Sequence, residues 1–151
     1  MFTLEDFAVK RKTTKEIIRD LTGELFSLTK GIAQVVSTQV DSPTLEILEM
    51  GLKSTNSILF GEEDSFLLYR VYLLGKRANN YRFLIMNYAH DITFYPVHFR
   101  LNESIAGEIG RSPRIRIDNE NENEIFLKSV FGSLRFKSIV GGLLQISLDL
   151  K

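Results

Sequence analysis

The sequence predicts an α+β fold in which N-terminal and C-terminal helices pack on an antiparallel sheet of about four strands. Apolar residues recur at helical spacing near both ends of the chain, whereas the central part is dense in Tyr, Phe, Leu, Ile and Val, which suit strands. The helical and strand-like stretches form consecutive runs and do not alternate strictly, which favours α+β over α/β. The chain has 151 residues, and we predict a single domain over residues 1–151.

The first predicted helix extends from Thr13 to about Ser37. Thr13 and Glu16 have the spacing of a capping box. Apolar residues then recur in steps of 3, 4, 3, 4 and 3, which places them on one face of a helix. This stripe consists of Ile18, Leu21, Leu25, Leu28, Ile32 and Val35. Such a helix must lie against either the protein's own sheet or another chain. We predict that it forms a protein interface, in a homodimer or in a complex with a partner protein.

A second helix is predicted to begin after Asp41 and to extend to about Ser54. Asp41 is a suitable N-cap residue, and Pro43 suits the first turn of a helix. Leucines follow at helical spacing, which supports this interpretation.

Four strands are predicted between residues 66 and 118. Three of them form a meander over Phe66–Lys76, Tyr81–Tyr88 and Ile92–Arg100. Pro96 has no N–H to donate to a neighbouring strand, so the third strand is expected to lie at an edge of the sheet or to be bulged there. Near residues 114–118, isoleucines alternate with charged residues and predict a short fourth strand.

Strand alternation divides the meander residues between two faces. The expected core face carries Leu67, Tyr69, Val71, Leu73, Phe83, Ile85, Tyr95, Val97 and Phe99. The other face carries Arg70, Tyr72, Arg82, Met86, Tyr88, Phe94, His98 and Arg100. Arginines interleaved with aromatic residues suit a face covered by the protein's own helices, a protein interface, or a surface for single-stranded nucleic acid, and we rank these roles in that order. The predicted partner-binding or nucleic-acid-binding residues are Arg70, Tyr72, Arg82, Tyr88, His98 and Arg100.

The C-terminal part of the chain predicts one clear helix and one ambiguous segment. Asn121 and Glu124 are spaced like an N-cap and its third residue, so a helix is expected from about Glu122 to Phe131, closed by Gly132. The acidic run Asp118–Glu124 is interpreted as a solvated loop that leads into this helix. Residues 133–150 fit both a helix and a hairpin turning at its glycine pair, and we favour the helix.

No motif in the sequence indicates catalysis or metal binding. The chain has no cysteine, which removes thiolate nucleophiles, disulfides and sulfur-ligated metals. His90 and His98 are the two histidines, and no nucleophile elbow or phosphate-binding loop accompanies them. The sequence therefore predicts a protein that is not an enzyme, with no catalytic residue, no metal site and no cofactor.

Charge and targeting signals complete the functional prediction. Lys plus Arg and Asp plus Glu both number 19, so no global field steers the chain onto nucleic acid or a membrane. The acidic N-terminus and the lack of long apolar runs predict a cytoplasmic protein without a signal peptide or a membrane span. We expect a non-enzymatic protein-interaction module, such as an accessory, immunity-type or chaperone-like partner protein of a bacterium or phage. The alternative is a nucleic-acid-binding regulator that uses the arginine- and tyrosine-bearing face of the sheet.

Overall fold

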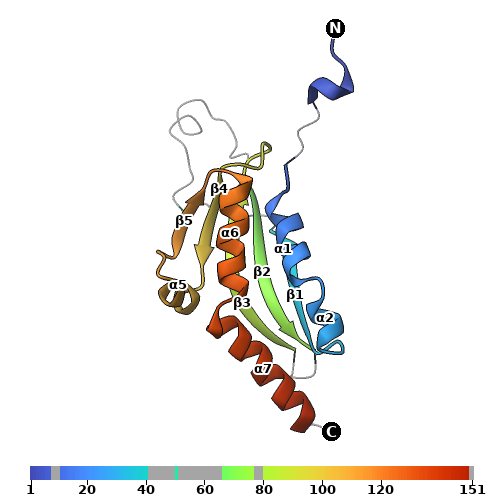
Figure 1. The fold of residues 1–151 in the computed structure, drawn as a ribbon, viewed down its shortest axis with the longest axis vertical. Helices are drawn as coiled ribbons and strands as arrows, with labels where there is room; N and C mark the ends of the chain where they lie inside the picture. The colour runs from blue at the N-terminus through green and yellow to red at the C-terminus, as the bar shows by residue number, and fades with distance from the viewer. Residues whose placement is uncertain (8–10, 41–49, 51–65, 77–79, 150–151) are drawn as a thin grey trace.

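The computed structural model describes residues 1–7, 11–40, 50, 66–76 and 80–149, and it has the predicted α+β architecture. The sheet contains five antiparallel strands in the order β1-β2-β3-β4-β5, one more than expected. The strands are β1 (Ala33–Gln39), β2 (Leu67–Gly75), β3 (Tyr81–His90), β4 (Val97–Leu101) and β5 (Arg114–Ile117). The helices are η1 (Leu4–Phe7), α1 (Thr14–Thr22), α2 (Leu25–Leu28), α5 (Glu103–Ile109), α6 (Glu120–Phe131) and α7 (Leu134–Asp149) (Figure 1).

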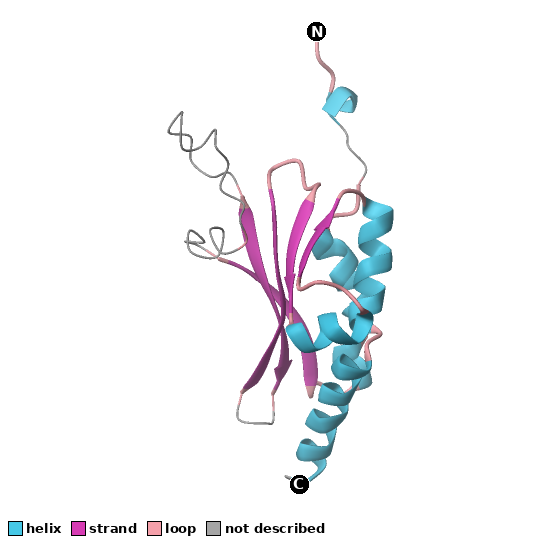
Figure 2. Cartoon of the chain, turned by 90° about the vertical axis from the view of Figure 1, so that its left-hand side faces the viewer, coloured by secondary structure: helices cyan, strands magenta, loops and turns pink. Residues whose placement is uncertain are grey.

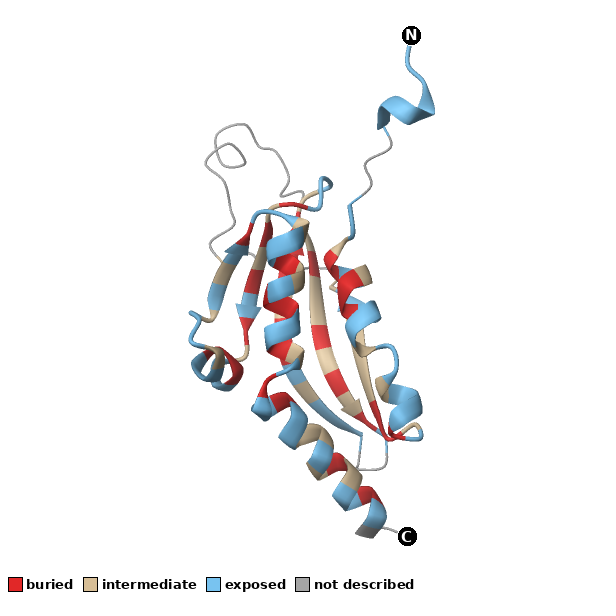
Figure 3. Ribbon diagram, viewed as in Figure 1, coloured by how far each residue is buried: buried red, intermediate tan, exposed pale blue. Residues whose placement is uncertain are grey.

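The core lies between one face of the sheet and helices α1, α6 and α7, which cover that face together (Figure 2). Phe126, Leu127 and Val130 form the buried stripe of α6, visible in Figure 3, because they recur at helical spacing. Ile17 and Ile18 of α1 are buried in the same core. The opposite face of the sheet carries none of these three helices (Figure 2).

The predicted long helix Thr13–Ser37 is wrong beyond its first nine helical residues. The capping box is confirmed, since the Thr13 hydroxyl accepts a hydrogen bond from the Glu16 N–H at 3.2 Å. However, α1 ends at Thr22, α2 is a single turn, and Lys30 and Gly31 adopt positive φ angles of 51° and 81° that reverse the chain. After Ile32, the seven residues Ala33–Gln39, which include Val35, Val36 and Thr38, form strand β1 against β2. The predicted second helix, from Asp41 to Ser54, falls almost entirely outside the described residues.

Strands β2 and β3 confirm the meander, but the third predicted strand begins late. Residues 91–96 form a turn, in which the Phe94 N–H donates to the Asp91 carbonyl at 3.1 Å, and β4 starts only at Val97. Pro96 therefore precedes the strand, and β4 lies inside the sheet between β3 and β5, so the expected edge position or bulge is wrong. Helix α5, which the sequence analysis missed, follows β4 and is capped by the Asn102 side chain.

A β-bulge between β2 and β3 exchanges the two faces of β3. Val71 pairs with Met86 but Tyr72 pairs with Leu84, which leaves Ile85 as an extra residue. Beyond the bulge, Met86 and Tyr88 therefore point toward the helices and are fully buried. Their predicted place on the outer face is wrong, because simple alternation assumes that no residue is inserted.

The C-terminal prediction is confirmed in type. Helix α6 starts at Glu120, two residues before the expected start, with Asn119 as its N-cap and Gly132 as its C-cap. Most of the acidic run is thus the first turns of a helix and not a loop. Residues 134–149 form α7, so the helix favoured for this segment over a hairpin is confirmed.

Helix α7 is capped at its N-terminus by Ser133, whose hydroxyl accepts from the Phe136 N–H at 3.2 Å, and also by a residue of a different helix. The Glu108 carboxylate accepts hydrogen bonds from the backbone N–H groups of Leu134 and Arg135, both at 2.7 Å. We expect Glu108→Ala to lower the free energy of unfolding by about 1 kcal/mol, since it leaves two helix N–H groups without this partner. Urea denaturation measures the loss, and Glu108→Gln, which keeps an acceptor oxygen, is expected to lose less. Equal stability of Glu108→Ala and the unchanged protein would contradict this capping role.

Candidate functional site

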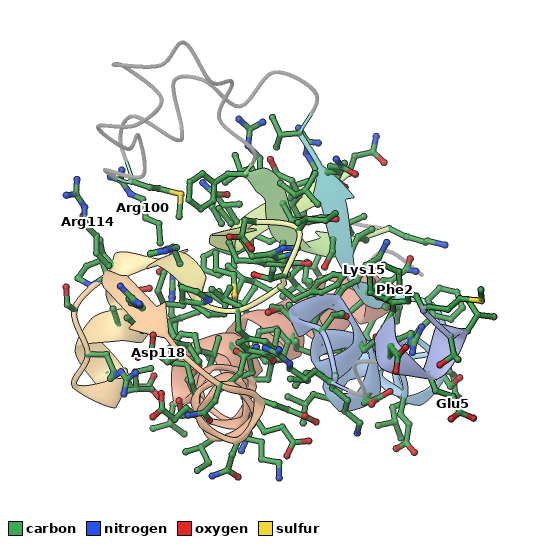
Figure 4. All side chains as sticks on the ribbon, turned by 90° about the horizontal axis from the view of Figure 1, so that it is seen from above. Phe2, Glu5, Lys15, Arg100, Arg114 and Asp118 are labelled. Atoms are coloured by element: carbon green, nitrogen blue, oxygen red, sulfur yellow. The ribbon has the colours of Figure 1, made fainter. Side chains whose placement is uncertain are left out.

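The face of the sheet opposite the helices carries five arginines, and we call it the arginine face. Every second residue of each strand lies on this face, except in β3, where the extra residue Ile85 shifts the alternation by one position. Its members are Gln34, Val36 and Thr38 of β1; Leu68, Arg70, Tyr72 and Leu74 of β2; Arg82, Leu84, Asn87 and Ala89 of β3; His98 and Arg100 of β4; and Arg114 and Arg116 of β5. None of these strand positions holds a carboxylate. Figure 4 shows Arg100 and Arg114 extending from the same side of the molecule.

The strand register arranges the polar residues of this face in one row across the sheet. Thr38 lies opposite Arg70, Arg70 opposite Asn87, Asn87 opposite Arg100, and Arg100 opposite Arg114. Neighbouring strands lie about 4.8 Å apart, so this polar row spans about 19 Å over all five strands. It contains three guanidinium groups and two neutral hydrogen-bonding side chains. Arg70 and Arg100 each already make an interaction within the chain.

Apolar residues flank the polar row on both sides. On one side, Leu68 and Ala89 are paired and fully buried, with Val40, Met50 and Phe66 packed against them. On the other side, Val36, Tyr72 and Leu84 lie next to one another, and Leu84 is 40% exposed. On the side of Leu84 the arginine face therefore combines cations with apolar surface, whereas on the side of Leu68 it is covered by Val40, Met50 and Phe66.

Two hollows lie on the arginine face, and each is lined by arginines. One, of about 360 Å³, lies over β1 and β2 and is lined by Arg70, Arg82 and Tyr72 among others. The Arg82 guanidinium stacks over the Tyr72 ring at 5.1 Å, which covers one side of that ring. The other hollow, of about 180 Å³, is lined by Arg114 and Arg116 of β5 and by His98 of the neighbouring strand β4.

Electrostatics within the face affect His98 and Arg116. Burial, and then the positive charge of Arg116, lower the pKa of His98 below its usual value, which favours the neutral imidazole. The Arg116 guanidinium donates to the Asp118 carboxylate at 2.9 Å. Both side chains of this pair are more than half exposed, so the ion pair contributes little to stability.

Most of the predicted binding residues of the sheet come together on this face. Arg70, Tyr72, Arg82, His98 and Arg100 share it, whereas Tyr88 lies in the core under the helices. Helices α1, α6 and α7 cover the opposite face, so none of these three covers the five residues. The predicted helix from Asp41 to Ser54 lies almost entirely outside the described residues, so the first-ranked interpretation stays a prediction. Arg114 and Arg116 were missed as members of the site. Their alternation with isoleucine indicated a strand, but not which strand it would pair with.

The residues of the predicted apolar stripe do not form one face. Ile18 and Ile32 are buried, Leu25 and Val35 are half-buried, and Leu28 is 76% exposed. Leu21 lies near the end of α1, and its side chain is 36% exposed. These six residues belong to α1, α2, the following turn and β1, so the prediction that they share one helical face is wrong. Their role in a protein interface stays a prediction.

The histidine and acid side chains singled out in the sequence make structural contacts. His90 is buried among the rings of Tyr69, Tyr88 and Phe94, with its Nδ1 atom 2.7 Å from the Asp91 carbonyl. The Asp91 carboxylate accepts hydrogen bonds from the Thr93 hydroxyl and N–H, which lower its pKa. Within the described part of the chain, no three His, Cys, Asp or Glu side chains are close enough together to hold a metal ion.

Compared with known proteins, the chain matches no family model, no curated protein and no solved structure. Among the residues that the structure describes, no helix has the length and apolarity that crossing a membrane requires. The arginine face is therefore interpreted from its own geometry.

Proposed function

We propose that this protein is a non-enzymatic interaction module of the cytoplasm whose arginine face binds an acidic surface of a partner protein. The polar row carries this proposal, because it aligns Arg70, Arg100 and Arg114 with two neutral hydrogen-bonding residues across all five strands. Arginine and aromatic residues are enriched in the centres of protein interfaces. The biological role that fits is an accessory, immunity-type or chaperone-like partner protein of a bacterium or phage.

The apolar flanks of the row support a protein partner. Val36, Leu74 and the exposed Leu84 offer surface that is stabilised when a partner removes it from water. Pairing two arginine faces in a homodimer would bring like charges together, so we propose a different protein as the partner at this face. The stripe is not one helical face, so the homodimer predicted from it stays a prediction and is not part of this proposal.

Nucleic acid is the second candidate ligand of the same face. The five arginines favour it, because guanidinium groups also bind phosphates. The Tyr72 ring is the aromatic group best placed to stack on a base, but Arg82 already covers one side of it. We therefore rank a protein partner first.

A charge-reversal pair tests the proposal. In Arg100→Glu/Arg114→Glu, two neighbouring members of the polar row change sign. We expect fluorescence anisotropy to show at least about tenfold weaker binding, equivalent to about 1.4 kcal/mol, of a labelled peptide of mixed Glu and Leu. The control Arg11→Glu/Lys137→Glu makes the same change in net charge at exposed residues outside the sheet, one before α1 and one on α7, and is expected to leave binding nearly unchanged.

Parallel titrations with a single-stranded oligonucleotide separate the two candidates. A protein-binding face is expected to prefer the peptide and to keep part of its affinity at high salt, through its apolar contacts. Binding of the oligonucleotide alone, falling steeply with salt, would instead favour the second candidate. Equal effects of the two double variants would contradict a role for the arginine face.

A further inference from the structure

Strand β1 ends the sheet with an edge that lacks the usual protection. Within the part of the chain that the structure describes, no strand pairs with its outer side. Its seven residues, Ala33–Gln39, include no charged residue and no proline. The opposite edge, β5, has four residues, two of them arginines, and follows Pro113 directly. Proteins block unwanted strand pairing with short strands, charges and proline, so β5 is protected and β1 is open to pairing.

A hollow of about 330 Å³ lies along this edge. Four consecutive residues of β1, 34–37, line it together with α1 and the Phe26 ring. Successive strand side chains point to opposite faces of a sheet, so a hollow lined by four in a row meets the edge of the strand and not just one face. Helix α1 runs beside β1 at this side of the molecule (Figure 1). An incoming strand therefore has room next to the backbone of β1.

The lining of the hollow defines the side chains that would fit. Its apolar part is formed by Ile18, by the half-buried Val35, and by Phe26, which is 41% exposed. Its charged part consists of Lys15 and Arg19, which lie one turn apart on α1 and are both exposed. No carboxylate lines the hollow. Apolar side chains alternating with acidic ones are complementary to this surface.

We propose that the β1 edge binds an extended, acidic segment of a different protein by β-strand addition. The hollow of this site shares Gln34 and Val36 with the arginine face but contains no residue of the polar row. The N–H and C=O groups of β1 after Ala33 supply the hydrogen bonds, since those of Ala33 already bond to the Thr29 hydroxyl. Lys15 and Arg19 select acidic side chains. A second copy of this chain is a poorer occupant. Antiparallel pairing of β1 with itself about a two-fold axis would bring the Lys15 and Arg19 pairs of both copies together at the middle of the strand.

The test uses a nine-residue peptide of alternating Glu and Val and the same peptide with alternate backbone nitrogens methylated. Methylation removes the hydrogen bonds of one strand edge but keeps charge and side chains, so we expect binding to weaken at least about tenfold. Hydrogen exchange is expected to slow at the amides of β1 on binding and to stay unchanged at β5. Equal binding of both peptides, or protection at β5 instead of β1, would overturn the proposal.

Two double variants distinguish this site from the arginine face. Lys15→Glu/Arg19→Glu is expected to weaken binding of the alternating peptide at least about tenfold, whereas Arg100→Glu/Arg114→Glu is expected to preserve the protection of β1. Both replace exposed side chains, so both variants should fold. Sedimentation of the unmutated protein without peptide is expected to show a monomer. A dimer whose β1 amides are already protected would assign the edge to a second copy and overturn the choice of occupant.

Discussion

Replacement of Tyr88 by alanine is expected to lower the free energy of unfolding by about 3–5 kcal/mol, the range found for buried aromatic residues. The Tyr88 side chain is fully buried, and its ring stacks on Tyr69 at 4.9 Å and lies 6.1 Å from Phe99. Alanine would leave a cavity between the sheet and the helices that the surrounding strands cannot fill. Urea denaturation with an unchanged m-value measures this loss.

Removing only the hydroxyl group of Tyr88 is expected to have no destabilising effect, in contrast to removing the whole side chain. The hydroxyl lies near Ser37 but makes no hydrogen bond of normal geometry, and burial raises its pKa far above that of free tyrosine. Removing a buried polar group that lacks a partner costs nothing in hydrogen bonding. Tyr88→Phe is therefore expected to be as stable as the unchanged protein or more stable by up to about 1 kcal/mol.

Tyr72 is the matched control for Tyr88. Simple alternation places both tyrosines on one face of the sheet, whereas the bulge separates them. Tyr72 is half-buried on the arginine face, so Tyr72→Ala is expected to cost clearly less than Tyr88→Ala. Similar losses at the two positions would contradict the bulge and return Tyr88 to the outer face.

The bulge also shows where sequence patterns stop being informative. Period-2 alternation predicted β2 and β3 as strands, and this is confirmed, because each pattern depends only on local residues. Which face a residue of β3 occupies depends on the register with β2, and one inserted residue reverses it. Met86 and Tyr88 were misplaced for this reason, while Arg82, on the other side of Ile85, was placed correctly.

The N-terminal stripe failed for a different physical reason. Ile32 and Val35 continue the helical spacing of the stripe, yet the chain reverses at Lys30 and Gly31 before reaching them. The Thr29 hydroxyl stabilises this turn by donating to the Leu25 carbonyl at 2.8 Å and accepting from the Ala33 N–H at 3.0 Å. Pairing with β2 then outweighs a helical periodicity that extends over only two more apolar residues.

The candidate site was predictable in its residue types but not in its extent. Arg70, Tyr72 and Arg100 follow from alternation within single strands. The polar row needs the pairing of β4 with β5, which joins Arg100 to Arg114 across a connection that contains the unpredicted helix α5. Strand order is a property of the whole fold, so a linear pattern does not contain it.

Asn123→Ala is expected to lower the free energy of unfolding by about 2–3 kcal/mol, although Asn123 lies within the acidic run that looked solvated. The side chain is fully buried on α6. Its Nδ2 atom donates to the Thr14 hydroxyl at 2.9 Å and to the Tyr95 hydroxyl at 3.2 Å. Tyr95 in turn donates to the Lys12 carbonyl at 2.8 Å. The network thus ties α6, the start of α1 and the turn before β4 together, and alanine would leave buried hydroxyl groups without this donor.

Two further variants separate the network from a simple loss of volume. Asn121→Ala, at an exposed position two residues earlier on α6, is expected to change stability by less than about 0.5 kcal/mol. Thr14→Val removes the acceptor while keeping the shape, so its cost and that of Asn123→Ala should not add in the double variant. Thermal or urea denaturation of the unchanged protein, Asn123→Ala, Thr14→Val and the double variant gives the coupling energy between the two residues, which we expect at about 1 kcal/mol. Strict additivity would mean that the hydrogen bond between α1 and α6 contributes nothing, and that apolar packing alone holds α1 to α6.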